Sequence, residues 1–365
     1  MLNQEENKLK KDLAQVVRLL HEERSSSIAY GEDYANLLDN HGKLIRATLT
    51  LIFSYAAEVQ EHGSNDFRRP DESQDTKMTA DEEGRVESLP SMASSVEEDE
   101  SGKRIGRHAR TLIGATAIEM LHLATLAHDD VIDNAPVRRG KPTVQTLDGN
   151  KAAIYLGDLL LSRYMEVMAT VAPDTGFLVQ QAHDVNEIVA GDLFQSSLAH
   201  DCSVTIEDYE RAIRGKTATL FRLACTTGTI LAVGRSDSSC IDRAAAIGEE
   251  LGMAYQIIDD IDDFDLTQKS DKPKLEDITS GIYTLPVILA LRDDPGFEAL
   301  LIKDKPDLIL EYFSRHPDYM LASKNEVKKH LDHAQALCNG DATPPLPQGP
   351  RTLLLRIIDK LRSAV

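Results

Sequence analysis

Apolar residues recur every three to four positions along most of the chain, a spacing that predicts amphipathic helices. Long helices are expected over residues 4–24, 32–58, 105–132, 148–171, 175–199, 206–228 and 236–265, with shorter ones to the C-terminus. No stretch alternates with a period of two for long enough to predict a sheet, and no internal repeat is found. The predicted fold is therefore all-α.

Residues 61–103 break the helical pattern. They are rich in Ser, Asp and Glu and carry 13 acidic against 5 basic side chains. With few large apolar residues, this segment cannot bury enough surface to offset its ordering entropy, so it is predicted to be a disordered insertion within one domain spanning 1–365. A tolerated surface loop is the simpler interpretation; a docking or regulatory segment is the alternative.

The net charge of −20 excludes a nucleic-acid binder, because no overall field attracts phosphate backbones. The four cysteines are scattered without CxxC spacing, which indicates reduced thiols and a cytoplasmic protein. The charged start of the chain predicts no signal peptide, and no apolar run has the length of a membrane span. Contact with a membrane surface stays open.

The strongest chemical signal is the stretch HDDVID at 128–133, at the end of an apolar helical run. On a helix, Asp129 and Asp133 stack on one face and Asp130 lies beside them. Three crowded carboxylates repel one another and oppose the helix dipole at a C-terminus. Hard oxygen ligands of this kind suit Mg²⁺, which bridges carboxylates to phosphates. A solvated acidic helix end is the alternative.

A second triplet repeats the spacing. Asp259, Asp260 and Asp263 again close a long helical pattern. One aspartate triplet is weak evidence, whereas two at equal spacing on separate helices are strong. Facing each other inside a helical bundle, the two triplets could hold a metal cluster with a diphosphate between them.

The two triplets resemble the paired DDxxD motifs of trans-prenyl diphosphate synthases, especially the long-chain heptaprenyl and octaprenyl enzymes. The segment AHDDVIDNAPVRRGKPTVQTLDGNKAAIYLGDLLL is similar to that family throughout, as is the order DDxxD, RRG, GKT, DDxxD. The resemblance implies an isoprenoid-synthase-type helical bundle around a central cavity. It also implies a multinuclear Mg²⁺ cluster, and a homodimer or a heterodimer with a small partner subunit.

The resemblance assigns the cations to two substrates, isopentenyl diphosphate and an allylic diphosphate. Arg138 is assigned to the allylic diphosphate and Arg139 to isopentenyl diphosphate, and guanidinium forks match phosphate oxygens. The stretch HGKLIRA at 41–47 resembles the family's GGKRLRP and would bind isopentenyl diphosphate through Lys43 and Arg46.

Further substrate contacts follow from the same resemblance. His122 matches a position that contacts isopentenyl diphosphate, although a lone histidine on an apolar face is as often a core residue. The glycine of GKT predicts a kink at 215–217 that exposes backbone. Lys216 and Thr217 match residues that bind the allylic diphosphate, and Gln256 matches a neutral polar contact to it. Lys272 matches the family lysine after the second triplet, with Lys274 as the alternative. Gln195 matches a glutamine near the reacting carbon, although it could equally be a surface amide.

Chain length is predicted from the helix that precedes the first triplet. In the family, bulky aromatics four and five residues before the first aspartate close the pocket early. Here these positions are the small Thr125 and Ala124, and Leu121 and Ile118 could form a later floor. We therefore expect a product of seven or eight isoprene units, C35–C40, of the kind used for quinone side chains.

Four other interpretations remain open besides the long-chain synthase. The chain could be the catalytic subunit of a heteromeric synthase, or a shorter-chain geranylgeranyl synthase. A non-catalytic subunit would lack aspartates that this chain keeps. A terpene cyclase would line its cavity with aromatic residues, and the sequence has no Trp.

Overall fold

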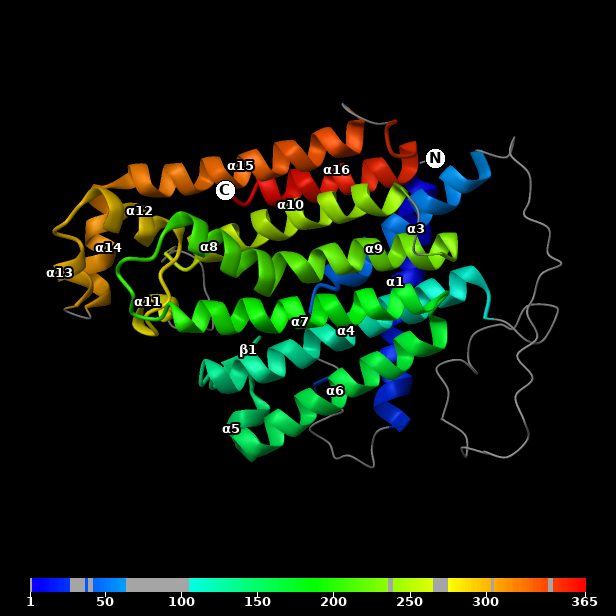
Figure 1. Ribbon diagram of the computed structural model, residues 1–365, viewed down its shortest axis with the longest axis horizontal. Coiled ribbons are helices and arrows are strands. Elements are labelled where there is room, and N and C mark those ends of the chain that lie inside the picture. The colour runs from blue at the N-terminus through cyan, green and yellow to red at the C-terminus, as the bar shows by residue number, and fades with distance from the viewer. Residues whose placement is uncertain are drawn as a thin grey trace.

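The computed structural model describes residues 2–26, 37–38, 42–63, 105–235, 239–264, 275–302, 305–340 and 344–365. Within these ranges the chain is almost entirely helical. Most of the long helices run roughly along one axis, and the N-terminal helix crosses them (Figure 1). The all-α fold predicted from the hydrophobic pattern is confirmed. The insertion predicted at 61–103 lies, from residue 64 onward, outside the described residues.

The first half of the chain supplies the helices that surround the candidate chemistry. They are α1 (Leu2–Ser26), α3 (Ile45–Gly63), α4 (Arg107–Ile132), α5 (Val144–Asp148), α6 (Asn150–Val171) and α7 (Thr175–Ser197), with a short hairpin of β1 (Val137–Arg138) and β2 (Lys141–Pro142) after α4.

The second half continues the bundle and adds smaller helices at one end. They are α8 (Ile206–Ile213), the π-helix η2 (Arg214–Ala218), α9 (Thr219–Val233), α10 (Ser239–Asp262), α11 (Glu276–Thr279), α12 (Leu285–Asp293), α13 (Glu298–Leu301), α14 (Pro306–Arg315), α15 (Pro317–Asn339) and α16 (Gln348–Arg362).

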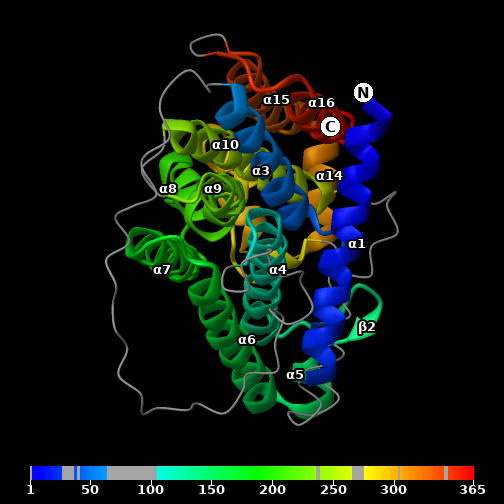
Figure 2. The same cartoon turned by 90° about the vertical axis from the view of Figure 1, so that its right-hand side faces the viewer.

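Helix α4 is the centre of the bundle. Every residue from 111 to 124 is buried, so this stretch is covered on all sides, as expected of a helix surrounded by others. It packs against α6, α9, α3 and α1, and Figure 2 shows it among these helices in a view along the bundle. The C-terminal end of α4 therefore delivers the first aspartate triplet from a rigid core element.

The helix predicted over 32–58 is not continuous in the structure, and its residues 32–36 and 39–41 lie outside the described residues. Gly42 and Leu44 adopt left-handed backbone, with φ of 66° and 51°, and α3 begins only at Ile45. A non-glycine residue in this region is uncommon, and such residues collect at functional turns. Lys43 therefore lies in an exposed turn before the helix rather than in its first turn.

The helix is interrupted at 215–217, where the π-helix η2 joins α8 to α9. The backbone there is not exposed as predicted, because Gly215 packs against the backbone of Gly191. A π-turn carries one residue more than an α-helical turn, and such turns are frequent at functional sites. A second, smaller core formed largely by α12, α13 and α14 contains Phe297 and Phe313, whose rings are 5.5 Å apart. None of the described helices is both long and apolar enough to cross a bilayer.

Candidate active site

The first triplet closes α4, and its three aspartates have different surroundings. Asp129 is half-buried, and burial, with Asp192 and Asp133 adding repulsion, raises its pKa to about 6 although Lys216 opposes the shift. Asp130 is buried and accepts a hydrogen bond from Arg138 Nε at 2.5 Å. Asp133 is exposed at the helix end, where its N–H donates to the Asp129 carbonyl oxygen at 2.8 Å.

Lys216 of the π-helix is the cation that faces the first triplet. Its Nζ lies 2.7 Å from Asp192 Oδ1 of α7. Burial lowers the pKa of Lys216, but the carboxylates of Asp129 and Asp192 more than offset this and raise it above its usual value. The ammonium is thus firmly protonated and held between two helices.

Two glycines bring these helices together. A Cβ on Gly191 would lie 2.5 Å from the Lys216 backbone nitrogen, and one on Gly215 would lie 2.7 Å from the Gly191 Cα. No side chain fits at either position, so α7 and the π-helix touch backbone to backbone. This contact sets Asp192, one residue after Gly191, against Lys216.

The second triplet closes α10 in a different setting. Asp259 is exposed, whereas Asp260 is buried and accepts hydrogen bonds from the Tyr209 hydroxyl at 2.5 Å and from Gln256 Nε2 at 2.8 Å. Burial, with repulsion from Asp277, raises the pKa of Asp260 to about 8 despite these two bonds. Asp263 Oδ1 accepts the backbone N–H of Leu275 at 3.1 Å.

A chain of hydrogen bonds joins the π-helix to the second triplet. The Thr217 hydroxyl donates to Gln256 Oε1 at 2.6 Å, and the amide of Gln256 then donates to Asp260. The residue after Lys216 is therefore fixed to α10, while Lys216 itself faces α4. The single turn of π-helix connects both triplets.

A group of arginines lies beside the triplets. The Arg46 guanidinium is 5.0 Å from the ring of Phe221, and its Nε is buried with no hydrogen-bond partner. Burial lowers the pKa of Arg46, and the positive charge of Arg139 lowers it further, whereas the negative charges of Glu119 and Asp259 raise it. A buried donor without a partner is suited to an anionic ligand.

The turn before α3 and the hairpin after α4 meet at this group. The guanidinium of Arg139 lies over Gly42, so close that a Cβ there would be 2.5 Å from its Cζ. Arg139 and Gly140 form the two-residue turn between β1 and β2, with φ of 53° and 74°, the left-handed geometry that such hairpins require. Gly42 and Arg46 of the first motif thus lie beside Arg139 of the VRRGKP hairpin.

His122 and Glu119 of α4 lie near the same arginines. Burial lowers the pKa of His122 well below its usual value, and Arg46 and Arg139 add to the effect, so the imidazole is neutral. Glu119 Oε1 accepts the Ala47 N–H at 2.8 Å and so caps the first turn of α3. Burial raises the pKa of Glu119 despite its arginine neighbours.

Sequence reasoning missed Glu119, Asp192 and Tyr209. A carboxylate inside the otherwise apolar run TLIGATAIEMLHLATLA must be paired, and this was a usable signal for Glu119. Asp192 and Tyr209 gave no comparable signal, because their partners, Lys216 and Asp260, are distant in sequence.

The remaining residues predicted from the sequence take no part in the hydrogen bonds and ion pairs described above. Gln195 is half-buried on α7, one turn after Asp192. Ala124 and Leu121 are each 1% exposed within α4, and the Thr125 hydroxyl donates to the His122 carbonyl at 2.9 Å. Lys272 lies outside the described residues. Within the described ranges, no three carboxylate, imidazole or thiol groups gather closely enough to hold a metal ion by themselves.

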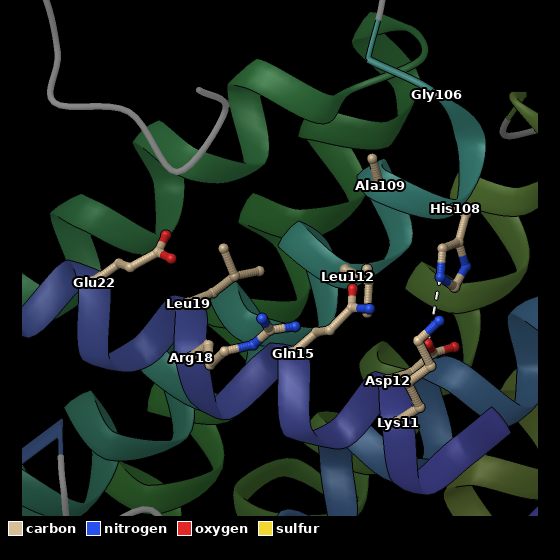
Figure 3. A pocket seen from close by; sticks show the side chains of 10 residues that line it. All are labelled: Lys11, Asp12, Gln15, Arg18, Leu19, Glu22, Gly106, His108, Ala109 and Leu112. Atoms are coloured by element: carbon tan, nitrogen blue, oxygen red, sulfur yellow. Dashed lines mark ion pairs between the residues drawn. The ribbon is translucent and has the colours of Figure 1, made fainter. Parts of the chain in front are cut away.

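A separate pocket of about 480 Å³ lies at the opposite end of α4, between its first turns and α1 (Figure 3). Its lining includes Lys11, Arg18 and Glu22, and His108 Nε2 lies 3.4 Å from Asp12 Oδ1. These charged side chains are far from both triplets along the helix, so the pocket is not part of the candidate site.

A family profile described as polyprenyl synthetase matches residues 90–306, well over half of the chain. The chain belongs to the polyprenyl synthetase family. The resemblance predicted from the paired triplets is therefore confirmed.

Curated relatives of this polyprenyl synthetase family member include long-chain synthases. The chain is 38% identical over 181 residues to heptaprenyl diphosphate synthase component 2 of Geobacillus stearothermophilus, covering 49% of this chain and 56% of that protein. It is 34% identical over 186 residues to nonaprenyl diphosphate synthase of Mycobacterium tuberculosis, covering 51% and 54%. The chain thus spans about half the length of the curated relatives it matches.

Solved structures resemble this chain over nearly its full length. Heptaprenyl diphosphate synthase from Staphylococcus aureus aligns with a TM-score of 0.75 and 26% identity, covering 97% of this chain and 98% of that one. Geranylgeranyl pyrophosphate synthase from Lactobacillus brevis aligns with a TM-score of 0.74 and 28% identity, covering 97% and 96%. The predicted isoprenoid-synthase-type bundle is confirmed.

Proposed function

We propose that this chain condenses isopentenyl diphosphate with an allylic diphosphate, in successive steps, to an all-trans polyprenyl diphosphate of seven or eight isoprene units. The observation that carries the proposal is the grouping of two aspartate triplets with Lys216, Arg138, Arg139 and Arg46 around one apolar helix bundle. Relatives named heptaprenyl and nonaprenyl diphosphate synthases support the long-chain product.

The residues present fit Mg²⁺. Repulsion from Asp133 and Asp192 contributes to the raised pKa of Asp129, and a divalent cation would relieve this repulsion. All candidate ligands are hard oxygens, which Mg²⁺ prefers. Asp129, Asp133 and Asp259 would hold the metal, with substrate oxygens and water completing its ligands. When bound, Mg²⁺ neutralises charge on a departing diphosphate.

The cationic side chains divide the work of binding two diphosphates. Lys216 and Arg138, each paired with a carboxylate, present positive charge to the allylic diphosphate as its C–O bond breaks. The buried Nε of Arg46, with Arg139 and neutral His122, would hold isopentenyl diphosphate.

The reaction then needs no nucleophilic side chain. The isopentenyl double bond attacks the allylic cation, and the departed diphosphate accepts the proton that is lost. Apolar side chains of α4 and α9 exclude water that would otherwise capture the cation.

The decisive test is product analysis with radiolabelled isopentenyl diphosphate, farnesyl diphosphate and Mg²⁺. The expected result is consumption of isopentenyl diphosphate with C35–C40 products, and Ala124→Phe should shorten them. Consumption of the allylic substrate alone would indicate a cyclase. No consumption by the isolated chain, with activity restored by a partner, would indicate a heteromeric enzyme, as the name component 2 implies for one relative.

An apolar face supports a second copy of this chain as the partner. Ile154 and Tyr155 of α6 are 42% and 63% exposed, and Val179, Val189 and Leu193 of α7 are 50–67% exposed. Exposed apolar groups concentrated on two helices are typical of subunit interfaces. The scattered cysteines keep the cytoplasm as the proposed compartment, where a long apolar product would be delivered to a membrane surface.

The interface is tested by molar mass in solution. Val179→Glu with Val189→Glu should convert a dimer to a monomer in light scattering after size exclusion. Val59→Glu, an equally exposed valine on α3, is the control and should remain dimeric. A wild-type monomer would contradict the homodimer, and a defined complex formed only with a co-purified small subunit would favour the heterodimer.

A further inference from the structure

A continuous hydrogen-bonded link crosses the otherwise apolar interior of the bundle. The Tyr164 hydroxyl of α6 donates to Gln181 Oε1 of α7 at 2.6 Å, and Gln181 Nε2 donates to Thr227 Oγ1 of α9 at 3.2 Å. All three residues are 0% exposed. We call Tyr164, Gln181 and Thr227 the crossbar.

The crossbar lies at a defined depth from the candidate site. Thr227 faces α4 at Gly114, where an added Cβ would be 3.5 Å from the Thr227 methyl group. Gly114 precedes Asp129 by 15 residues on the same helix, which corresponds to about 22 Å at 1.5 Å per residue. Ile118 and Leu121, both fully buried, lie between the two levels.

Buried apolar side chains flank the crossbar along α6 and α9. Leu160 and Met168 flank Tyr164 by one turn on α6, and Leu223 and Leu231 flank Thr227 by one turn on α9; all are 0% exposed. Protein interiors of this kind contain few voids. An apolar chain that grew past the crossbar would separate its hydrogen-bonded groups and could not replace their partners, which is unfavourable for buried polar atoms.

We infer that the crossbar is a length-determining element for the growing isoprenoid chain; this rests on the proposed function. An extended isoprene unit is about as long as one helical turn, roughly 5.4 Å, so the distance along α4 from Asp129 to the crossbar corresponds to about four units. Additions up to that length proceed without disturbing it. Each later addition requires the link between α6, α7 and α9 to open, so the crossbar sets the ratio of short to full-length product.

The experiment compares product distributions at a fixed excess of isopentenyl diphosphate. Tyr164→Phe combined with Gln181→Leu removes the polar atoms of α6 and α7 together and leaves neither of these two positions with an unpaired group. We expect the ratio of products with four or fewer units to longer products to fall about tenfold, the effect of about 1.4 kcal/mol. The rate of the first condensation should not change.

Two single variants sharpen the comparison. Thr227→Val removes only the hydroxyl at the end of the crossbar and should shift the ratio in the same direction by a smaller factor. Thr229→Val is the matched control, because Thr229 is also a buried threonine of α9 but its hydroxyl donates to the Cys225 carbonyl of its own helix at 3.1 Å. Its product ratio should equal that of the wild type.

An unchanged ratio in a folded crossbar variant would overturn the inference. If the double variant does not fold, Thr227→Val against Thr229→Val decides the question. Failure of the wild type to consume isopentenyl diphosphate, alone and with a partner subunit, would instead refute the proposed function, so the two failures are distinguishable.

Discussion

The two aspartate triplets have the same spacing and close two long helices, yet the fold treats them differently. In the first, Asp130 is balanced by a cation, Arg138, and Asp129 faces another, Lys216. In the second, Asp260 is balanced by neutral donors from Tyr209 and Gln256. Two triplets with the same sequence spacing thus have different partners: charged side chains at the first and neutral hydrogen-bond donors at the buried aspartate of the second.

This difference suggests a division of labour. Protein cations at the first triplet can hold a diphosphate directly, whereas the second triplet has only neutral groups bonded to its buried aspartate. Exposed Asp259 is then the member of the second triplet best placed to reach a metal shared with a substrate.

The largest effect is expected at the two aspartates that we place at the metal, one from each triplet. Asp129→Ala and Asp259→Ala should each lower the rate of isopentenyl diphosphate consumption by about 10²–10³-fold, because each removes charge stabilisation in the transition state. Circular dichroism should be unchanged. Asp293→Ala, at an exposed helix end, is the control. Near-native turnover of either site variant at saturating Mg²⁺ would exclude its role as a ligand.

The next effect concerns the cation of the first triplet. Arg138→Gln should raise the KM for the allylic diphosphate by about tenfold or more, since a charge-assisted hydrogen bond to phosphate is lost. The KM of the wild type should also rise with salt more steeply than that of the variant. Ions screen the attraction between Arg138 and the diphosphate, which the variant lacks. Equal salt dependence in both proteins would show that Arg138 serves only Asp130.

A smaller effect is expected at the neutral partner of the second triplet. Tyr209→Phe should lower the free energy of unfolding by about 1–2 kcal/mol, because buried Asp260 loses a hydrogen bond of 2.5 Å. Urea titration measures this change. Tyr312→Phe is the control, since Tyr312 donates to the less buried Asp294 at 2.9 Å and should cost less. Equal losses would mean that burial of Asp260 does not matter.

The smallest effect separates the third aspartates. Asp263→Asn keeps an oxygen that can accept the Leu275 N–H, so the backbone contact should remain and turnover should change by less than about threefold. Asp133→Asn, at an exposed position facing Asp129, should lower turnover more. The reverse order of the two rates would place Asp263 rather than Asp133 at the metal.

The sequence was sufficient for the fold class and for local patterns. Helical periodicity predicted the long helices, Gly215 predicted the interruption that became the π-helix, and two triplets predicted the family. Contacts between segments that are distant in the sequence could not be predicted from the sequence. Nothing local shows that Tyr209 will meet Asp260, or that Glu119 will cap α3, because such partners are set by how helices pack.

The start of α3 shows the same limit from another side. The hydrophobic pattern runs through residues 42–44, but two left-handed residues stop the helix there. Glycine at 42 permits this conformation, whereas leucine at 44 gives no warning, since it usually avoids it. Tertiary contacts with Arg139 and Glu119 fix this turn.

The extra residue in the π-helix constrains the chain in length as well as in composition. Removing one residue from 214–218 would restore an α-helical turn and rotate α8 by about 100° relative to α9. Tyr209 would then leave Asp260, or Lys216 would leave Asp192. A substitution in this segment changes one side chain and leaves the helices in place. A single-residue deletion would rotate one helix relative to the other and separate the two halves of the site.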